Sequence, residues 1–233
     1  MANRTAIITG AGRGIGAAIA RALHAEGYAL ALMSPSGAAA GLALELGGVG
    51  ITGSVTEPED LARLVDTTMK AYGRIDALVN NAGAPAAGDL LEISDNVWKE
   101  SHDLSLLSVV RLCRLVTPVM AAQRQGAIVN ISSYLSHQPD LEYPMSSVYR
   151  AALASFTKMY ADRYGPEGIR MNSIGPGFME NWNFPKETAQ RIPLRRFGTM
   201  DEIGKLAAFL LSDAAGYLTG LNLPIDGGLT RAS

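Results

Sequence analysis

The stretch Thr9-Gly10-Ala11-Gly12-Arg13-Gly14-Ile15-Gly16 follows the apolar run Ala6-Ile7-Ile8 and opens a helical pattern. It therefore predicts a strand, a tight turn and a helix N-terminus. Glycine at positions 10, 14 and 16 lets the backbone turn sharply and approach a ligand closely. Backbone N–H groups converge there at the positive end of the helix dipole, which favours a bound phosphate. The stretch thus predicts a cradle for the pyrophosphate of a dinucleotide, with the spacing G-x-x-x-G-x-G.

Apolar runs of strand length alternate with helical patterns along the whole chain. This alternation is typical of βαβ units and of a parallel sheet with helices on both faces. We expect strands over residues 4–9, 28–33, 49–53, 75–80, 126–132, 169–175 and 221–225. We expect helices over residues 14–26, 37–46, 57–72, 96–123, 146–164 and 201–212. The predicted fold is α/β, a single Rossmann-type domain over residues 1–233 with a doubly wound parallel sheet.

Composition and charge exclude several classes of function. The 233 residues are 48% apolar, which is enough for one well-buried core. A net charge of −2 provides no positive field for nucleic acid. The three histidines are scattered and Cys113 is the only cysteine, so we expect no metal site and no intrachain disulfide. No apolar run reaches roughly 18 residues and the first strand begins near Met1, so we expect a cytoplasmic protein without a membrane partner.

Small and polar residues follow three of the predicted strands, where ligands bind in open parallel sheets. Asn80-Asn81-Ala82-Gly83 follows the fourth strand, Ser132-Ser133 follows the fifth, and Gly175-Pro176-Gly177-Phe178 follows the sixth. Residues 176–200 form a long irregular stretch with several prolines. Long loops of this kind often cover binding sites, so we expect this stretch to be the substrate loop.

The chain resembles the short-chain dehydrogenase/reductase family through a series of ordered motifs. These are Thr-Gly-x-x-x-Gly-Ile-Gly at 9–16, Asn-Asn-Ala-Gly at 80–83, Ile-Val-Asn-Ile-Ser-Ser at 128–133, Ile-Arg-Met-Asn-Ser-Ile-Gly-Pro-Gly at 169–177 and Leu-Thr-Gly-Leu-Asn-Leu-Pro-Ile-Asp-Gly-Gly at 218–228. The resemblance covers essentially the whole chain. It implies a seven-stranded sheet, an NAD(P) cofactor over the glycine turn, and a homotetramer or homodimer formed through helices 96–123 and 146–164.

The resemblance also implies where proton transfer should occur, and there the sequence departs from the family. The family uses a serine, a tyrosine thirteen residues later, a lysine four residues after that, and a helical asparagine upstream. With Ser133 as the serine, these positions hold Ser146, Arg150 and Ser105. Serine is a far weaker acid than tyrosine. Arginine keeps its proton, so it can hold ribose hydroxyls or an anion but cannot relay protons.

Other groups near these positions are candidates for the missing proton donor. Tyr149 lies three residues after Ser146, so its phenol points roughly 60° around the helix from the expected direction. Tyr143, Tyr134 and His137 belong to the loop or helix start beside the site. The predicted catalytic set is therefore Ser133, Ser146, Arg150 and Tyr149. For Tyr149, an ordinary packing role is the alternative.

The predicted cofactor is NADP(H) in preference to NAD(H). An NAD site normally has an acidic residue at the end of the second strand, whereas Ser34 stands there and Arg13 is the nearby cation. The resemblance places Ser54 beside the adenine and Asn181 near the carboxamide. The residues expected to contact the cofactor are Gly10, Arg13, Gly14, Ile15, Gly16, Ser34, Ser54, Val55, Asn81, Ala82, Gly83, Arg150, Pro176 and Gly177.

Three functions are compatible with these residues. The first is an NAD(P)-dependent oxidoreductase that acts on a small carbonyl or alcohol substrate through an atypical site. The second is a non-redox enzyme, either a lyase or similar to halohydrin dehalogenases, which pair serine and tyrosine with arginine. Those enzymes lack the glycine turn that this chain keeps, and their tyrosine is missing here. The third is a catalytically silent nucleotide-binding protein.

Overall fold

Seven parallel strands form the centre of the computed structural model, which describes residues 4–231. The strands are β1 (Thr5–Thr9), β2 (Ala29–Ser34), β3 (Val49–Thr52), β4 (Ala77–Asn80), β5 (Gly126–Ile131), β6 (Ile169–Pro176) and β7 (Asn222–Ile225). Their order across the sheet is β3-β2-β1-β4-β5-β6-β7, so the order reverses between β1 and β4. The predicted doubly wound α/β fold is confirmed, with strand bounds within two residues of those expected.

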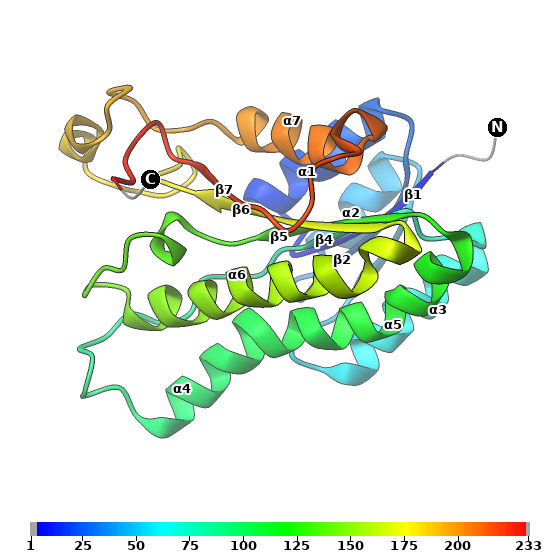
Figure 1. Cartoon of the computed structure of the whole chain (residues 1–233), viewed down its shortest axis with the longest axis horizontal. Helices are drawn as coiled ribbons and strands as arrows, with labels where there is room; N and C mark the ends of the chain where they lie inside the picture. Colours follow the sequence, from blue (N-terminus) through cyan, green and yellow to red (C-terminus); the bar gives the residue numbers. More distant parts are fainter. Residues whose placement is uncertain (1–3, 232–233) are drawn as a thin grey trace.

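Helices cover both faces of the sheet (Figure 1). One face carries α1 (Gly14–Ala25), α2 (Ala38–Glu45) and α7 (Met200–Leu211), and the other carries α3 (Pro58–Tyr72), α4 (Asp95–His102), α5 (Ser108–Gln123) and α6 (Pro144–Tyr164). Side chains alternate between faces along a strand. Ala6 and Ile8 of β1 accordingly pack with α1 and α7, whereas Ile7 packs with α3 and α5.

The helix predicted over 96–123 is divided into three parts. Between α4 and α5 the chain forms a π-helical segment, Asp103–Leu107. By length and composition alone, Asp95–Gln123 would be long and apolar enough to cross a membrane. In the fold, however, Leu112, Val116 and Met120 of α5 are buried in the core that covers the sheet. The apolar character of this segment is therefore used for packing.

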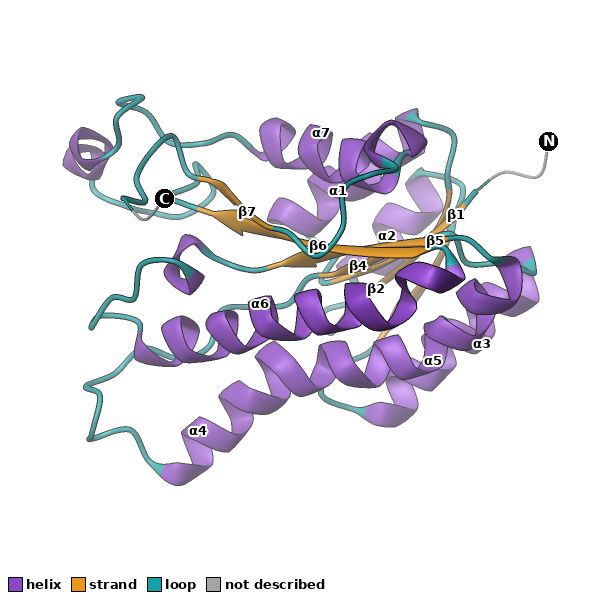
Figure 2. Ribbon diagram, in the orientation of Figure 1, coloured by secondary structure: helices purple, strands orange, loops and turns teal. Residues whose placement is uncertain are grey.

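The long loops gather at the end of the sheet toward which the strands point (Figure 2). Residues 176–200 contain a short 3₁₀ helix, Lys186–Arg191, and a bridge between Met179 and Gly198, so this stretch is more ordered than its irregular sequence predicts. A second long segment without strand or helix, residues 81–94, connects β4 to α4, in the interval left between the predicted strand 75–80 and helix 96–123. The end of the sheet is thus enclosed by two long segments.

Candidate active site

The turn between β1 and α1 has the conformation that its glycines predict. Gly10 and Gly14 have φ angles of +58° and +55°, which L side chains rarely adopt. A Cβ on Gly10 would lie 2.6 Å from the carbonyl oxygen of Asn81. Helix α1 begins at Gly14, and its first backbone N–H groups have no partner within the helix. The turn therefore presents donors to an anion at a helix N-terminus.

Asn81 fixes this turn against β4. Its backbone N–H donates to Thr9 Oγ1 over 3.0 Å, and the Thr9 hydroxyl donates back to the Asn81 carbonyl over 2.9 Å. The Asn81 side-chain amide donates to the carbonyls of Thr9 and Gly10 over 3.2 and 3.1 Å. These bonds join the two strands between which the sheet order reverses, which is where ligands bind in such folds.

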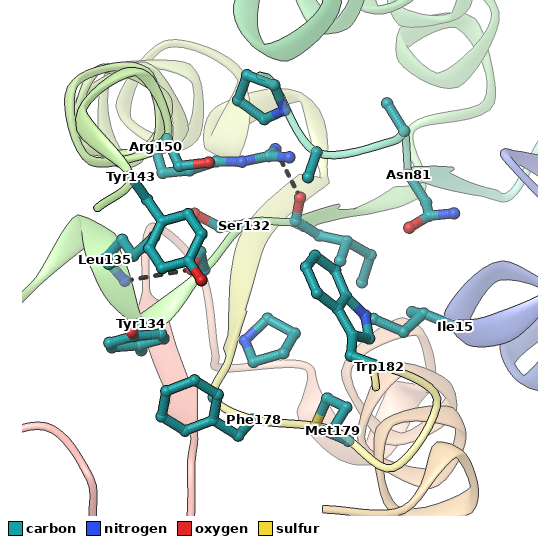
Figure 3. Close-up of a pocket in the computed structure, with 18 of the residues that line it drawn as sticks. Ile15, Asn81, Ser132, Tyr134, Leu135, Tyr143, Arg150, Phe178, Met179 and Trp182 are labelled. Carbon is teal, nitrogen blue, oxygen red and sulfur yellow. Dashed lines mark hydrogen bonds between the residues drawn. The ribbon is translucent and has the colours of Figure 1, made fainter. Parts of the chain in front are cut away.

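A pocket of about 240 Å³ opens beside the turn at the carboxyl ends of the strands (Figure 3). It is lined by Ile15, Asn81, Ala82, Ala84, Pro85, Ala87, Ile131, Ser132, Ser133, Tyr134, Leu135, Tyr143, Ser146, Arg150, Pro176, Gly177, Phe178, Met179, Trp182 and Phe184. The pocket thus brings together residues from the glycine turn, the segment after β4, the loop after β5, helix α6 and the stretch 176–200. Most of its wall is apolar, with a few polar groups.

The two serines of the predicted catalytic set lie on this pocket. Ser133 follows β5, and its hydroxyl accepts a hydrogen bond from the backbone N–H of Leu135 over 3.3 Å. Ser146 belongs to the first turns of α6 and is only 9% exposed. Ser132, between β5 and Ser133, has a buried hydroxyl that is unpaired among residues 4–231. Three hydroxyls are therefore available to hold a polar atom in an otherwise apolar space.

Arg150 also lines the pocket, one helical turn after Ser146. It is 6% exposed, and one guanidinium nitrogen donates to the carbonyl of Ile131 over 2.9 Å. Its Nε is buried and unpaired among the described residues. Burial lowers the pKa of Arg150 to about 10, so the side chain remains a cation at neutral pH. Arg150 is the one charged residue among those that line the pocket in the described chain.

A buried chain of hydrogen bonds holds α6 in place on the sheet. Asn80 donates to the Asn130 side chain over 2.8 Å, and Asn130 donates to the Thr157 hydroxyl over 3.0 Å. Thr157 is also 2.8 Å from the hydroxyl of Ser173. This chain links β4, β5 and β6 to a residue two turns after Arg150. It therefore fixes the helix that carries the two α6 residues of the pocket.

The structure places Tyr149 outside the lining of the pocket that the other three residues of the predicted catalytic set share. Its hydroxyl donates to the carbonyl of Trp98 over 2.9 Å, and its ring packs edge-on against the Trp98 indole. The 60° offset from Ser146 is enough to turn Tyr149 toward α4 and away from the pocket. His137 is also turned away, with its Nε2 3.1 Å from the carbonyl oxygen of Asn222.

Two other tyrosines do line the pocket. Figure 3 shows the ring of Tyr143 beside Ser132, and Tyr134 facing Phe178. The Tyr134 hydroxyl is buried and unpaired among residues 4–231, and burial raises its pKa to about 12. A raised pKa makes Tyr134 a poorer acid. Tyr143 is half-buried and is the remaining phenol at the site.

Some of the residues expected around the cofactor line the pocket, and others lie outside it. Ile15, Asn81, Ala82, Pro176 and Gly177 line the pocket, whereas Gly83 is exposed outside its lining. Val55 packs into the core and lines a cavity of about 10 Å³ shared with Ser105 and Arg150.

Ser34 and Ser54, which were expected at the ribose and the adenine of the cofactor, form hydrogen bonds within the protein. The hydroxyl of Ser34 accepts from the N–H of Ala39 over 3.0 Å, beside the start of α2. The N–H of Ser54 donates to the carboxylate of Asp60 over 2.8 Å. Arg13 is exposed at the N-cap of α1, and Asn181 of the substrate loop lies over Gly14. Arg13 and Asn181 are therefore the side chains placed to approach a ligand at the turn.

Comparison with known proteins agrees with this geometry. The family model described as enoyl-(acyl carrier protein) reductase matches residues 10–230. Oxidoreductase UcpA of Escherichia coli (strain K12) is 36% identical over 253 residues, which cover 99% of this chain and 95% of UcpA. The 3-oxoacyl-[acyl-carrier-protein] reductase FabG of Chlamydia trachomatis is 32% identical over 243 residues, with 98% of each chain covered. The chain belongs to the short-chain dehydrogenase/reductase family.

Comparison of the structure with solved structures indicates the same family. A solved structure from Sinorhizobium meliloti 1021, assigned to the short-chain alcohol dehydrogenases, matches with a TM-score of 0.92 and 29% identity. The match covers 100% of this chain and 98% of that chain. Together with the names of the sequence relatives, it supports an oxidoreductase of the short-chain dehydrogenase/reductase type.

Sequence reasoning missed several features of this short-chain dehydrogenase/reductase site. Ala84, Pro85 and Ala87 line the pocket from segment 81–94, and the dense Gly, Ala and Pro content after Asn81 was the available signal. The unpaired hydroxyl of Ser132 and the chain through Asn130 had no comparable signal. Both depend on contacts between elements that are distant in sequence.

Proposed function

We propose that the protein is an NAD(P)-dependent oxidoreductase that acts on a small carbonyl or alcohol substrate through an atypical active site. The observation that carries the proposal is that one pocket joins Ile15 of the glycine turn to Ser133, Ser146 and Arg150. A dinucleotide held at the turn would extend directly into a space with groups that bind a polar substrate atom. The family membership supports a nicotinamide cofactor in this position.

The residues at the turn fit a nicotinamide dinucleotide, which supplies or accepts a hydride when bound. Gly10 and Gly14 hold the turn at positive φ angles, and the start of α1 offers N–H donors for the pyrophosphate. Arg150 would hold ribose hydroxyls through its guanidinium N–H groups, which donate but do not accept. Asn181 lies over Gly14, so the substrate loop would close above the bound phosphates.

The pocket residues polarise a substrate oxygen more readily than they protonate it. Ser133 and Ser146 can donate hydrogen bonds to a carbonyl, but their hydroxyls are weak acids. Arg150 keeps its proton at neutral pH because its pKa is about 10. A positioned general acid is typically worth about 10²–10⁴-fold in rate. We therefore infer slow turnover of simple ketones, with water or Tyr143 as the proton source.

Calorimetry with NADPH and NADH tests the cofactor proposal. We expect NADPH to bind more tightly, because Ser34 stands where an acidic residue would repel a 2′-phosphate and Arg13 lies exposed at the turn. Arg13→Ala should weaken NADPH binding about 5-fold, equivalent to about 1 kcal/mol for an exposed charge pair, and should change NADH binding much less. Arg21→Ala, an exposed arginine of the same helix, is the matched control. Failure of both dinucleotides to bind would refute the cofactor proposal and favour a non-redox function.

We also infer a homodimer or homotetramer formed through α4–α5 and α6. Val148 and Met159 of α6 are 49% and 63% exposed. A surface groove between α5 and α6 is lined by apolar groups, among them Val110 and Phe156. A symmetric helix-to-helix contact would cover this surface. Light scattering should therefore give two or four times the chain mass at micromolar concentration, and a monomer under these conditions would contradict the inference.

We further infer a cytoplasmic location, with a small molecule as the main partner and neither nucleic acid nor membrane. The net charge of −2 supports this inference, because no excess positive charge is available to bind phosphodiesters or anionic lipids. Cys113 supports a reducing compartment, because this only cysteine of the chain is a buried free thiol.

A further inference from the structure

Arg150 carries a charge that the described protein does not neutralise. Its side chain is buried, and the hydrogen bond to Ile131 goes to a neutral carbonyl. Among residues 4–231, no carboxylate forms an ion pair with Arg150. The pocket that it lines has no acidic residue among the described lining groups. A cation in this environment is costly unless a negative group joins it.

The proposed cofactor does not provide that negative group at Arg150. Ribose hydroxyls and the nicotinamide carboxamide are neutral, and the pyrophosphate belongs at the glycine turn, across the pocket in Figure 3. Two hydroxyls, those of Ser133 and Ser146, line the pocket with Arg150 and can donate to the same anion. Guanidinium and hydroxyl donors together are the groups that bind a carboxylate in proteins.

We propose that the pocket binds small organic monocarboxylates, with the carboxylate paired to Arg150 and its apolar part packed against Tyr134, Phe178 and Trp182. This names the substrate class of the proposed oxidoreductase as oxo or hydroxy acids. The role as substrate rests on the proposed function, whereas binding of the carboxylate requires only the pocket. The aromatic side chains limit the apolar part to a small group, because the pocket of about 240 Å³ would also hold the nicotinamide end of the cofactor.

Trp182 allows this binding to be measured without a cofactor. It lines the pocket, and the chain has one other tryptophan, Trp98, on α4. In a Trp98→Phe background, the fluorescence of Trp182 reports occupancy of the pocket. Sodium butyrate is the probe, butyramide is its neutral counterpart of the same shape, and sodium chloride controls for ionic strength. We expect a saturable change with butyrate that butyramide and chloride do not produce.

Variants in the same background identify the group responsible. Arg150→Met should weaken butyrate binding about 10- to 100-fold, the usual worth of a charge-assisted hydrogen bond. Arg150→Lys keeps the charge and should bind with intermediate affinity. Arg163→Met, an exposed arginine of the same helix, should leave the affinity unchanged.

Three results would overturn the proposal: equal responses to butyrate and butyramide, an equal response to chloride, or unchanged butyrate affinity in Arg150→Met. If Arg150→Met does not fold, the comparison of the two probes on the unmutated pocket still decides. The cofactor proposal fails separately, because it is tested by dinucleotide calorimetry. If butyrate binds and neither dinucleotide binds, the proposed oxidoreductase function is refuted and the proposed carboxylate site stands.

Discussion

The double variant Ser146→Tyr/Arg150→Lys is expected to reduce simple ketones with NADPH faster than the parent, by part of a factor of about 10²–10⁴. Ser146 lines the pocket with Ser133, so a tyrosine there would bring a phenol to the substrate. Lysine at position 150 lies one turn later on the same face of α6 and would favour ionisation of that phenol as a nearby cation. Turnover is measured by the loss of NADPH absorbance over a panel of ketones.

The single variants serve as controls for this expectation. Tyrosine beside arginine lacks a group that relays the proton, and lysine without tyrosine has no phenol to activate. Each single change should therefore recover less activity than the pair. A double variant that folds and binds NADPH but reduces no ketone faster than the parent would contradict the account. Fast turnover by the parent would instead indicate an existing acid, which Tyr143→Phe would identify.

Arg150→Met is expected to stabilise the protein in the absence of ligands by about 1–3 kcal/mol, on the scale seen when buried charged groups are replaced by apolar ones. The Arg150 guanidinium has no anionic partner among the described residues, and it is charged at pH 7 because burial lowers its pKa only to about 10. Methionine is flexible and fills a similar apolar space. Chemical denaturation of parent and variant measures the free energy of unfolding.

The sign of the change in the free energy of unfolding shows whether the charge of Arg150 serves ligand binding or stabilises the fold. If Arg150 stabilised the fold through its bond to Ile131, methionine would lower the free energy of unfolding. A loss of stability would therefore contradict the view that the charge is uncompensated. Arg163→Met changes an exposed ion pair with Glu167 and should alter stability by less than about 1 kcal/mol. Saturating butyrate should stabilise the parent more than Arg150→Met, so the difference between their free energies of unfolding should become smaller.

The sheet and the glycine turn could be predicted because their signals are local. Strand-length apolar runs such as Ala6-Ile7-Ile8 and the glycines at 10 and 14 constrain the backbone wherever they occur. The π-helical segment Asp103–Leu107 lies inside a continuous apolar helical pattern and leaves no comparable local signal. The predicted elements leave residues 81–95 as a connection, but its part in the pocket was missed, because Ala84, Pro85 and Ala87 carry no polar group that marks a site.

The site was predicted only in part, because it depends on the directions of side chains, which a sequence gives only approximately. Ser133, Ser146 and Arg150 do meet on one pocket, as their positions after β5 and along α6 predict. Tyr149 lies outside the pocket lining, because the offset of about 60° from Ser146 directs its phenol to the carbonyl of Trp98. The lack of an acidic residue beside Arg150 could not be predicted from the sequence, because it depends on how the described elements pack around the guanidinium.

Deuterium transfer tests the central claim most directly, that this pocket supports hydride exchange between a nicotinamide dinucleotide and a small acid. The parent is incubated with NADPH deuterated at the transferable position and with a series of short oxo acids, and the products are analysed by mass spectrometry. We expect hydroxy acids that carry one deuterium, formed slowly by the parent and in smaller amount by Arg150→Met. Absence of labelled product from the parent and from Ser146→Tyr/Arg150→Lys, with NADPH bound to both, would contradict it.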